Sequence, residues 1–292
     1  MQVIEKHKRY YGINTSETIS QPLTSSLARR QDLIAMHKWF QKLQLLDGLP
    51  QHDFTHYNRK TWEWAYIAQA LFERGMLVDN TCGIGFAVGS EPLSALFAKH
   101  GATILATDLD DTNSQASIWK SGNQHASNLA TLEHPAICEK DIFYKNVSFK
   151  PINMNEIPPV SEIGEFDFCW SSCAFEHIGS EQQGMDFLLN TLKLLKPGGV
   201  SVHTTEYNLS SNKTAITEWG NVFGQDFFKD LFKEVTSRGY SIAPLDYRLG
   251  IHPDEDYVYN WEGNKSHFKL KLGESVATSI GIIIEKTKEN QV

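Results

Sequence analysis

From Met76 onward, short apolar runs of β character alternate with amphipathic helical segments, and this alternation leaves few folds open. It predicts parallel strands that are joined by helical crossovers. We expect the strands at residues 84–88, 103–107, 147–152, 166–170 and 200–204. Two later runs, residues 267–272 and 277–285, are separated only by a short turn, which requires antiparallel neighbours. The expected fold class is therefore α/β, with a mostly parallel sheet, flanking helices and a C-terminal antiparallel hairpin.

Capping and stop signals predict the helices. Residues 180–183 match a capping box and precede leucines at helical spacing. Two N-terminal helices are expected, at about residues 25–46 and 60–74, and a later one at 226–238. Residues 1–75 are thus expected to form a helical extension or lid. The α/β domain would follow over 76–292, with an insertion at about 207–264 that faces the substrate.

Composition narrows the class of partner. The formal net charge of −8 repels polyanions on average, so nucleic acid is not an expected partner. No apolar run approaches the ~20 residues that cross a bilayer, and the first residues lack the apolar core of a secretory signal. The four cysteines are too few and too scattered for a disulfide framework. We expect a cytoplasmic protein without a membrane partner; the oligomeric state stays open.

The segment GFAVGSEPLSALFAKHGATILATD has the order strand, turn, helix, strand, acid. In Rossmann-like units, a glycine turn lets the backbone approach the ligand, and an acid about 20 positions later accepts hydrogen bonds from ribose hydroxyls. Gly89 and Asp108 occupy these two places. A structural turn with an exposed Asp108 is the alternative interpretation.

Together with this unit, two further segments resemble class I S-adenosylmethionine-dependent methyltransferases. They are FDFCWSSCAFEHIG at residues 166–179 and LLKPGGVSVHTTEY at residues 194–207. The resemblance runs from about Met76 to Lys286. It implies a Rossmann-like fold and an enzyme that binds S-adenosylmethionine as cofactor and transfers its methyl group. The terminal hairpin is similar to the antiparallel strands that distinguish this family from dinucleotide-binding dehydrogenases.

The resemblance implies a cofactor site made of Gly89, Ser90, Glu91, Asp108, Asn153, Ser171 and Ser172. Asn153 stands where the family often has an acid near the adenine, and an amide can also serve the exocyclic amine. The family's usual acid at the end of the first strand is Ala87 here. Glu91 either replaces that acid by facing the methionine ammonium or only stabilises the first helical turn.

Methyl transfer requires a nucleophile in line with the sulfonium methyl and, for a hydroxyl, a base that removes its proton. His177 and His203 follow or end the fourth and fifth strands, where ligands of open α/β sheets bind, and are the candidate catalytic bases. Glu176 is a candidate to orient His177. Each histidine could instead be held in the core by a backbone carbonyl.

Ser171-Ser-Cys-Ala-Phe175 differs from the Asn/Asp-Pro-Pro-Tyr/Phe sequence of enzymes that methylate amino groups of DNA and glutamine, which favours O-methylation of a small hydroxylated metabolite or sugar. An NAD(P)-dependent oxidoreductase stays open, because Gly83, Gly85 and Gly89 also match a dinucleotide fingerprint. A catalytically silent cofactor-binding module is a third possibility. No metal is expected, since the three carboxylates at 254–256 lack a calcium-loop signature.

Overall fold

The computed structural model describes residues 59–245, 247, 257–262 and 267–288. The expected helix at 25–46 and the acidic residues 254–256 lie outside these ranges. The second expected N-terminal helix is present as α4 (Arg59–Glu73). None of the helices in the described ranges is both long and apolar enough to span a membrane.

The first five strands of the main sheet are β1 (Cys82–Gly85), β2 (Thr103–Asp108), β3 (Val147–Pro151), β4 (Phe166–Ser172) and β5 (Leu195–Asn208). They pair in parallel in the order β3-β2-β1-β4-β5. The later strands are β8 (Tyr240–Ile242), β9 (Val258–Tyr259), β10 (Lys269–Leu272) and β11 (Ser275–Lys286). β11 runs antiparallel to both β5 and β10, so the expected terminal hairpin is confirmed.

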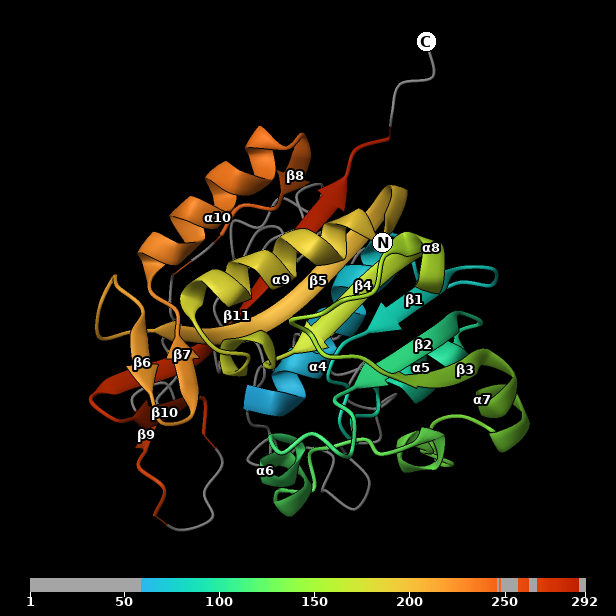
Figure 1. Cartoon of the computed structure of the whole chain (residues 1–292), viewed down its shortest axis with the longest axis horizontal. Coiled ribbons are helices and arrows are strands. Elements are labelled where there is room, and N and C mark those ends of the chain that lie inside the picture. The colour runs from blue at the N-terminus through green and yellow to red at the C-terminus, as the bar shows by residue number, and fades with distance from the viewer. Residues whose placement is uncertain (1–58, 246, 248–256, 263–266, 289–292) are drawn as a thin grey trace, which may run out of the picture.

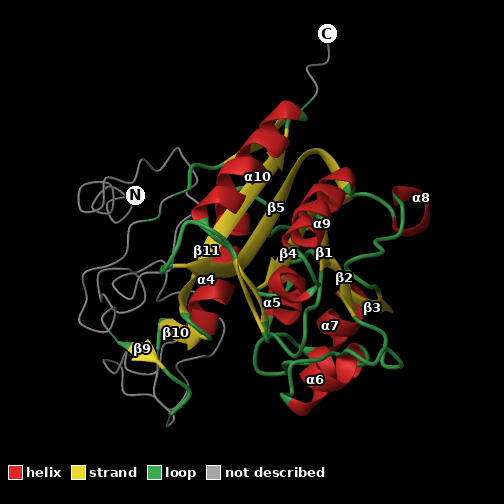
Figure 2. Cartoon of the chain, turned by 60° about the vertical axis from the view of Figure 1, so that its left-hand side comes forward, coloured by secondary structure: helices red, strands yellow, loops and turns green. Residues whose placement is uncertain are grey.

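Helices cover both faces of the sheet. The other helices are α5 (Leu93–Lys99), α6 (Ala116–Ser121), α7 (Lys140–Asn146), α8 (Val160–Ile163), α9 (Glu181–Lys193) and α10 (Gln225–Ser237), with short 3-10 turns η2 (Leu129–Leu132) and η3 (Phe175–His177). Figure 1 shows α9 and α10 in front of the sheet and α4 and α5 behind it. Figure 2 shows α6 and α7 near the edge strand β3, at the end of the sheet away from β9 and β10.

The period of two along β4 divides the core between the two faces. Phe168 and Trp170 pack with α4 and α5, whereas Cys169 packs with α9 and α10. The glycines of the neighbouring strand β1 make room for these rings: a Cβ at Gly83 would overlap Phe168, and one at Gly85 would overlap Trp170. Both glycines are therefore packing residues inside the sheet.

The capping box that begins α9 is confirmed. Ser180 Oγ accepts from the Gln183 N–H at 3.3 Å, and Gln183 Oε1 accepts from the Ser180 N–H at 2.9 Å. β1 begins two residues and ends three residues earlier than expected, and the positive φ of 48° at Ala87 prevents extended pairing farther along the chain. The sequence patterns also missed a separate hairpin, β6 (Ala215–Thr217) with β7 (Gly220–Val222), whose strands are too short to show a period.

Candidate active site

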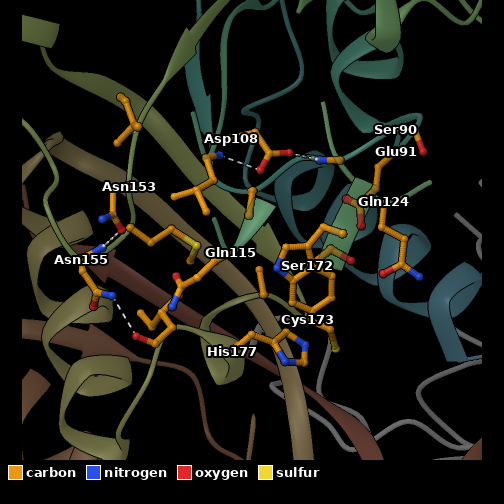
Figure 3. A pocket seen from close by; sticks show the side chains of 18 of the residues that line it. Ser90, Glu91, Asp108, Gln115, Gln124, Asn153, Asn155, Ser172, Cys173 and His177 are labelled. Carbon is orange, nitrogen blue, oxygen red and sulfur yellow. Dashed lines mark hydrogen bonds between the residues drawn. The ribbon is translucent and has the colours of Figure 1, made fainter. Parts of the chain in front are cut away.

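A cavity of about 300 Å³ lies at the carboxyl ends of β1, β2, β3 and β4. Open α/β sheets bind ligands at this edge. Seven of the predicted site residues line it: Gly89, Ser90, Glu91, Asp108, Asn153, Ser172 and His177. Figure 3 shows Asp108 between Asn153 on one side and Glu91 on the other, with Cys173 and His177 facing it across the cavity. The structure thus brings together most of the predicted cofactor residues and one of the two predicted bases.

Asp108 fixes the shape of the Gly89 turn. Its Oδ2 accepts from the backbone N–H groups of Gly89 and Ala126, both at 3.0 Å, and its Oδ1 accepts from that of Leu109 at 2.8 Å. Burial raises the pKa of Asp108, and the three N–H groups oppose that rise. A carboxylate has about four lone-pair sites. One site on Oδ1 therefore remains for a ligand hydroxyl.

Gly89 has a φ of +54°, which explains why a glycine is needed there. A Cβ at this position would also lie 2.7 Å from the carbonyl oxygen of Gln124. The turn after β1 is therefore packed directly against the segment that follows α6. Because Asp108 binds N–H groups of both segments, the two loops form one wall of the cavity.

Glu91 and Lys60 form a charged pair in the wall of the cavity. Lys60 Nζ lies 3.5 Å from Glu91 Oε1 and 3.0 Å from the carbonyl oxygen of Ser172. Glu91 Oε2 is buried without a hydrogen-bond partner among the described residues. Burial raises the pKa of Glu91 to about 7, and the charge of Lys60 offsets this only in part. A buried, unpartnered carboxylate oxygen requires a donor, and an ammonium group would supply one.

Amide side chains that follow β3 lie on the opposite side of the cavity. Asn153 Oδ1 accepts from the Asn155 N–H at 3.0 Å, and Asn155 Nδ2 donates to the Ile178 carbonyl at 2.8 Å. These bonds hold the turn that carries Asn153. The Asn153 Nδ2 donor and the second lone pair of its oxygen are suited to the edge of a heterocyclic base.

Two predicted site residues, Ser171 and His203, point away from the cavity, which corrects their expected roles. His203 packs on Phe187 of α9, and its ring nitrogens lie 2.7 Å from Ser171 Oγ and 2.6 Å from Ser201 Oγ. Burial lowers the pKa of His203 to about 3, so the ring is neutral. Side chains alternate along a strand, and since Ser172 faces the cavity, Ser171 and its neighbour His203 face the other way.

Glu176 is buried beneath His177 and does not line the cavity. Its Oε2 accepts from Thr205 Oγ1 at 3.0 Å, and its Oε1 lies 4.0 Å from His177 Nε2. Burial, assisted by the charge of Glu206, raises the pKa of Glu176 to about 8. Glu176 is therefore largely protonated at neutral pH, and the expected hydrogen bond that would orient His177 is not formed.

His177 lies in η3, directly after β4, and lines the cavity. Its Nδ1 donates to the backbone carbonyl of Trp219, and its ring lies 4.7 Å from that of Trp119, centroid to centroid. Burial lowers the pKa of His177. A neutral ring that donates from Nδ1 keeps an accepting lone pair on Nε2. This is the form in which a histidine acts as a base.

Cys173 stands at the end of β4 in a left-handed conformation, with a φ of +46°. Its N–H donates to the Thr204 carbonyl at 3.0 Å, which holds the residue in place. The Arg59 guanidinium lies 3.4 Å from Cys173 Sγ. Non-glycine residues rarely adopt this conformation, and they are enriched at functional sites.

Several lining residues were not predicted from the sequence: Lys60, Trp64, Gln115, Trp119 and Gln124. Lys60 and Trp64 belong to α4, which was expected as a helix but could not be placed against the sheet from its period alone. The short helix α6 carries Trp119, and it was not predicted at all. Among the described residues, no group of three or more His, Cys, Asp or Glu side chains has a metal-binding arrangement.

No protein-family model matches the sequence, and no curated protein matches it significantly. Solved structures are similar to it at low identity. A Burkholderia thailandensis 1,6-didemethyltoxoflavin-N1-methyltransferase with bound S-adenosylhomocysteine is 12% identical over 91% of this chain and 94% of that one, with a TM-score of 0.46. An O-methyltransferase family protein from the same species is 12% identical, with coverages of 80% and 60% and a TM-score of 0.42.

A protein from Galdieria sulphuraria assigned as a sarcosine dimethylglycine methyltransferase is 20% identical over 60% of this chain, with a TM-score of 0.36; the match spans about half, 51%, of that protein. These likenesses are too remote to carry an argument about activity. The strand order β3-β2-β1-β4-β5-β11-β10 and the reversed strand β11 decide the fold. It is a Rossmann-like α/β fold with a mostly parallel sheet and a C-terminal antiparallel hairpin, as expected.

Proposed function

We propose that the protein is an S-adenosylmethionine-dependent methyltransferase that acts on a hydroxyl group of a small molecule. The observation that carries the proposal is the order of groups around the cavity: the base-binding amide of Asn153, the carboxylate of Asp108, then the charged pair of Glu91 and Lys60. This order matches the adenine, ribose and amino-acid parts of the cofactor.

The residues present fit that cofactor. Glu91 Oε2, which is buried and unpartnered, would accept from the ammonium group, and Lys60 would face the carboxylate. The free site on Asp108 Oδ1 would accept from a ribose hydroxyl. When bound, S-adenosylmethionine supplies an electrophilic methyl group. The protein then has to orient the acceptor and remove its proton.

His177 is the residue that we assign to proton removal. It lines the cavity, is neutral, and has Nε2 available as an acceptor. A hydroxyl acceptor needs such a base, whereas a neutral amine can attack without one. The segment Ser171–Phe175, which lacks the sequence typical of enzymes that methylate DNA or glutamine amino groups, also favours an oxygen acceptor.

Isothermal titration calorimetry with S-adenosylhomocysteine tests the cofactor assignment. The variant Asp108→Asn is expected to raise Kd about tenfold or more, because it weakens charge-assisted hydrogen bonds of about 1.5–3 kcal/mol. The matched control is Asp110→Asn, which removes an exposed carboxylate two residues away and should leave Kd within twofold. Binding of NADH without binding of S-adenosylhomocysteine would instead identify an oxidoreductase.

A further inference from the structure

The hairpin β6–β7 (residues 215–222) packs on the segment that carries His177 and is not part of the main sheet. The chain directly after β7 is attached to β5, because the Phe223 N–H donates to the Glu206 carbonyl at 2.9 Å. In Figure 1 the hairpin lies at the end of β5, next to β10.

Three consecutive residues of the hairpin hold that segment. The Trp219 carbonyl accepts from His177 Nδ1. Gly220 has a φ of +136°, and a Cβ there would lie 2.9 Å from His177 Nδ1 and 2.5 Å from the Glu176 carbonyl oxygen. Asn221 is buried, and its Nδ2 donates to the Glu176 carbonyl at 3.2 Å and to a further carbonyl of the same loop.

The turn of the hairpin is fixed from within. Thr217 Oγ1 accepts from the Trp219 N–H at 3.2 Å and donates to the Gly220 carbonyl at 2.9 Å. The peptide group before Trp219 and the one after Gly220 are therefore anchored, and the peptide group that carries the Trp219 carbonyl lies between them. The Trp219 carbonyl is held in the direction of His177 rather than being free to turn toward solvent.

This contact determines which nitrogen of His177 carries the proton. A carbonyl oxygen can only accept, so the nitrogen that meets it must be protonated. Nδ1 is that nitrogen. Among the described residues, none forms a hydrogen bond to Nε2, and Glu176 Oε1, at 4.0 Å, is beyond hydrogen-bond distance.

The charges around His177 oppose one another. Burial is the largest effect and lowers its pKa. The charge of Glu206 and the bond to the Trp219 carbonyl raise the pKa, whereas Lys60 and Arg59 lower it further. Glu176, the other titratable neighbour, is itself largely protonated near neutral pH. The imidazole therefore stays neutral at pH 7 and needs a fixed tautomer to act as a base.

We infer that the β6–β7 hairpin is a positioning element that selects the Nδ1–H tautomer of His177 and leaves Nε2 as the base beside the cavity. The inference rests on the proposed methyl transfer to a hydroxyl. In that reaction Nε2 takes the hydroxyl proton while the oxygen–methyl bond forms and the sulfur–methyl bond breaks. The products are a methyl ether, a neutral thioether and a protonated imidazole. Trp219, Gly220 and Asn221 act through His177 and touch no reacting atom.

Long-range 1H–15N NMR correlations of histidine-labelled protein test the tautomer directly. In the wild type, we expect the Nδ1–H form of His177. Gly220→Ala should displace the hairpin, and Asn221→Ala should loosen it without backbone strain; both should give mixed tautomers. The matched control is Gly273→Ala, which also places alanine at a positive φ, +58°, but in open space. It should keep the wild-type tautomer.

The kinetic prediction is that Gly220→Ala and Asn221→Ala each lower kcat about tenfold or more relative to the wild type. The acid limb of the kcat pH profile should also shift. The Kd for S-adenosylhomocysteine should stay within twofold of the wild-type value. An Nε2–H tautomer in the wild type would overturn the inference. So would an Asn221→Ala variant that keeps both the Nδ1–H form and the wild-type kcat. Failure to bind S-adenosylhomocysteine would remove the proposed function but leave the tautomer result standing, so the two failures are distinguishable.

Discussion

The carboxyl group of Glu91 titrates close to neutral pH, because burial raises its pKa to about 7 while Lys60 attracts its ionised form. Below that pH the group is neutral and no longer attracts an ammonium group. The affinity for S-adenosylhomocysteine is thus expected to fall about tenfold between pH 8 and pH 6, as the ionised fraction falls from about 0.9 to about 0.1. Calorimetry across this range measures the effect.

The control for that prediction is Glu91→Gln, which has a similar shape but cannot ionise. Its Kd should be weaker than that of the wild type at pH 8 and nearly independent of pH. A wild-type Kd that does not change from pH 8 to pH 6 would contradict the assignment of Glu91 to the ammonium group.

The buried His203 ring leads to a prediction about how the stability of the folded protein depends on pH. Burial lowers its pKa from 6.5 to about 3, so the folded protein holds it neutral while the unfolded chain protonates it below pH 6.5. The contribution of the neutral His203 ring to the free energy of unfolding is complete above pH 6.5 and is lost progressively as the pH falls toward 3. From pH 7 to pH 5 the loss is about 2 kcal/mol.

Urea unfolding of the wild type and of His203→Gln measures this contribution. The stability advantage of the wild type over the variant at pH 7 should shrink by about 2 kcal/mol at pH 5, while other titrating groups cancel between the two proteins. An advantage that stays constant would mean that His203 is accessible to protons in the folded state.

At the residue scale, most of the predicted cofactor residues line the cavity, whereas only His177 of the predicted catalytic residues does. Gly89 and Asp108 were found because a fixed spacing along one βαβ unit brings them together. The prediction that His203 lies in the site was wrong, because a position at the end of a strand does not tell on which face of the sheet the side chain lies. Successive side chains of a strand lie on opposite faces of the sheet. Ser171 could therefore have been excluded from the site if Ser172 had been known to face the cavity.

Helix α4 packs on the sheet through buried apolar side chains and also through a buried charged network. Glu63 is fully buried, within 3.2 Å of Arg59 and 3.1 Å of Lys60, and also accepts from Ser279 of β11. Burial alone would raise the pKa of Glu63, but Lys60 and Arg59 lower it to about 2. Removing this carboxylate would leave two cations without their buried partner.

Glu63→Gln is therefore expected to lower the free energy of unfolding by about 3–5 kcal/mol, the usual cost of breaking a buried ion pair from one side. Urea denaturation measures it. Glu73→Gln, which changes an exposed carboxylate at the end of the same helix, serves as the control and should change stability by less than about 0.5 kcal/mol. Equal effects of the two variants would contradict the buried network.

At the element scale, elements with clear signals were predictable and short ones were not, although β5 (Leu195–Asn208) extends well beyond the expected 200–204 at both ends. The capping box and the leucine spacing placed α9, and the apolar runs placed β2, β3 and β4 within two residues. Helix α6 has only six residues, and the strands β6 and β7 have three each. Their form depends on contacts with β5, η3 and the cavity, which local sequence does not encode.

For the whole molecule, the fold was predictable because the strand and helix order permits few right-handed topologies. The position of α4 could not be predicted from the sequence, because its contacts with β4, β5 and β11 join segments more than 100 residues apart. The competing dinucleotide interpretation also depended on the whole sheet. Gly83 and Gly85 match its spacing, but in three dimensions they make room for the rings of Phe168 and Trp170.

The three backbone N–H groups bound by Asp108 also bear on how a ligand would enter. They join loops from three parts of the chain through protein hydrogen bonds alone, so this wall of the cavity is preorganised. Little conformational entropy then remains to be lost there on association. Stopped-flow binding of a fluorescent cofactor analogue should follow a single exponential whose rate rises linearly with concentration, as for a one-step encounter.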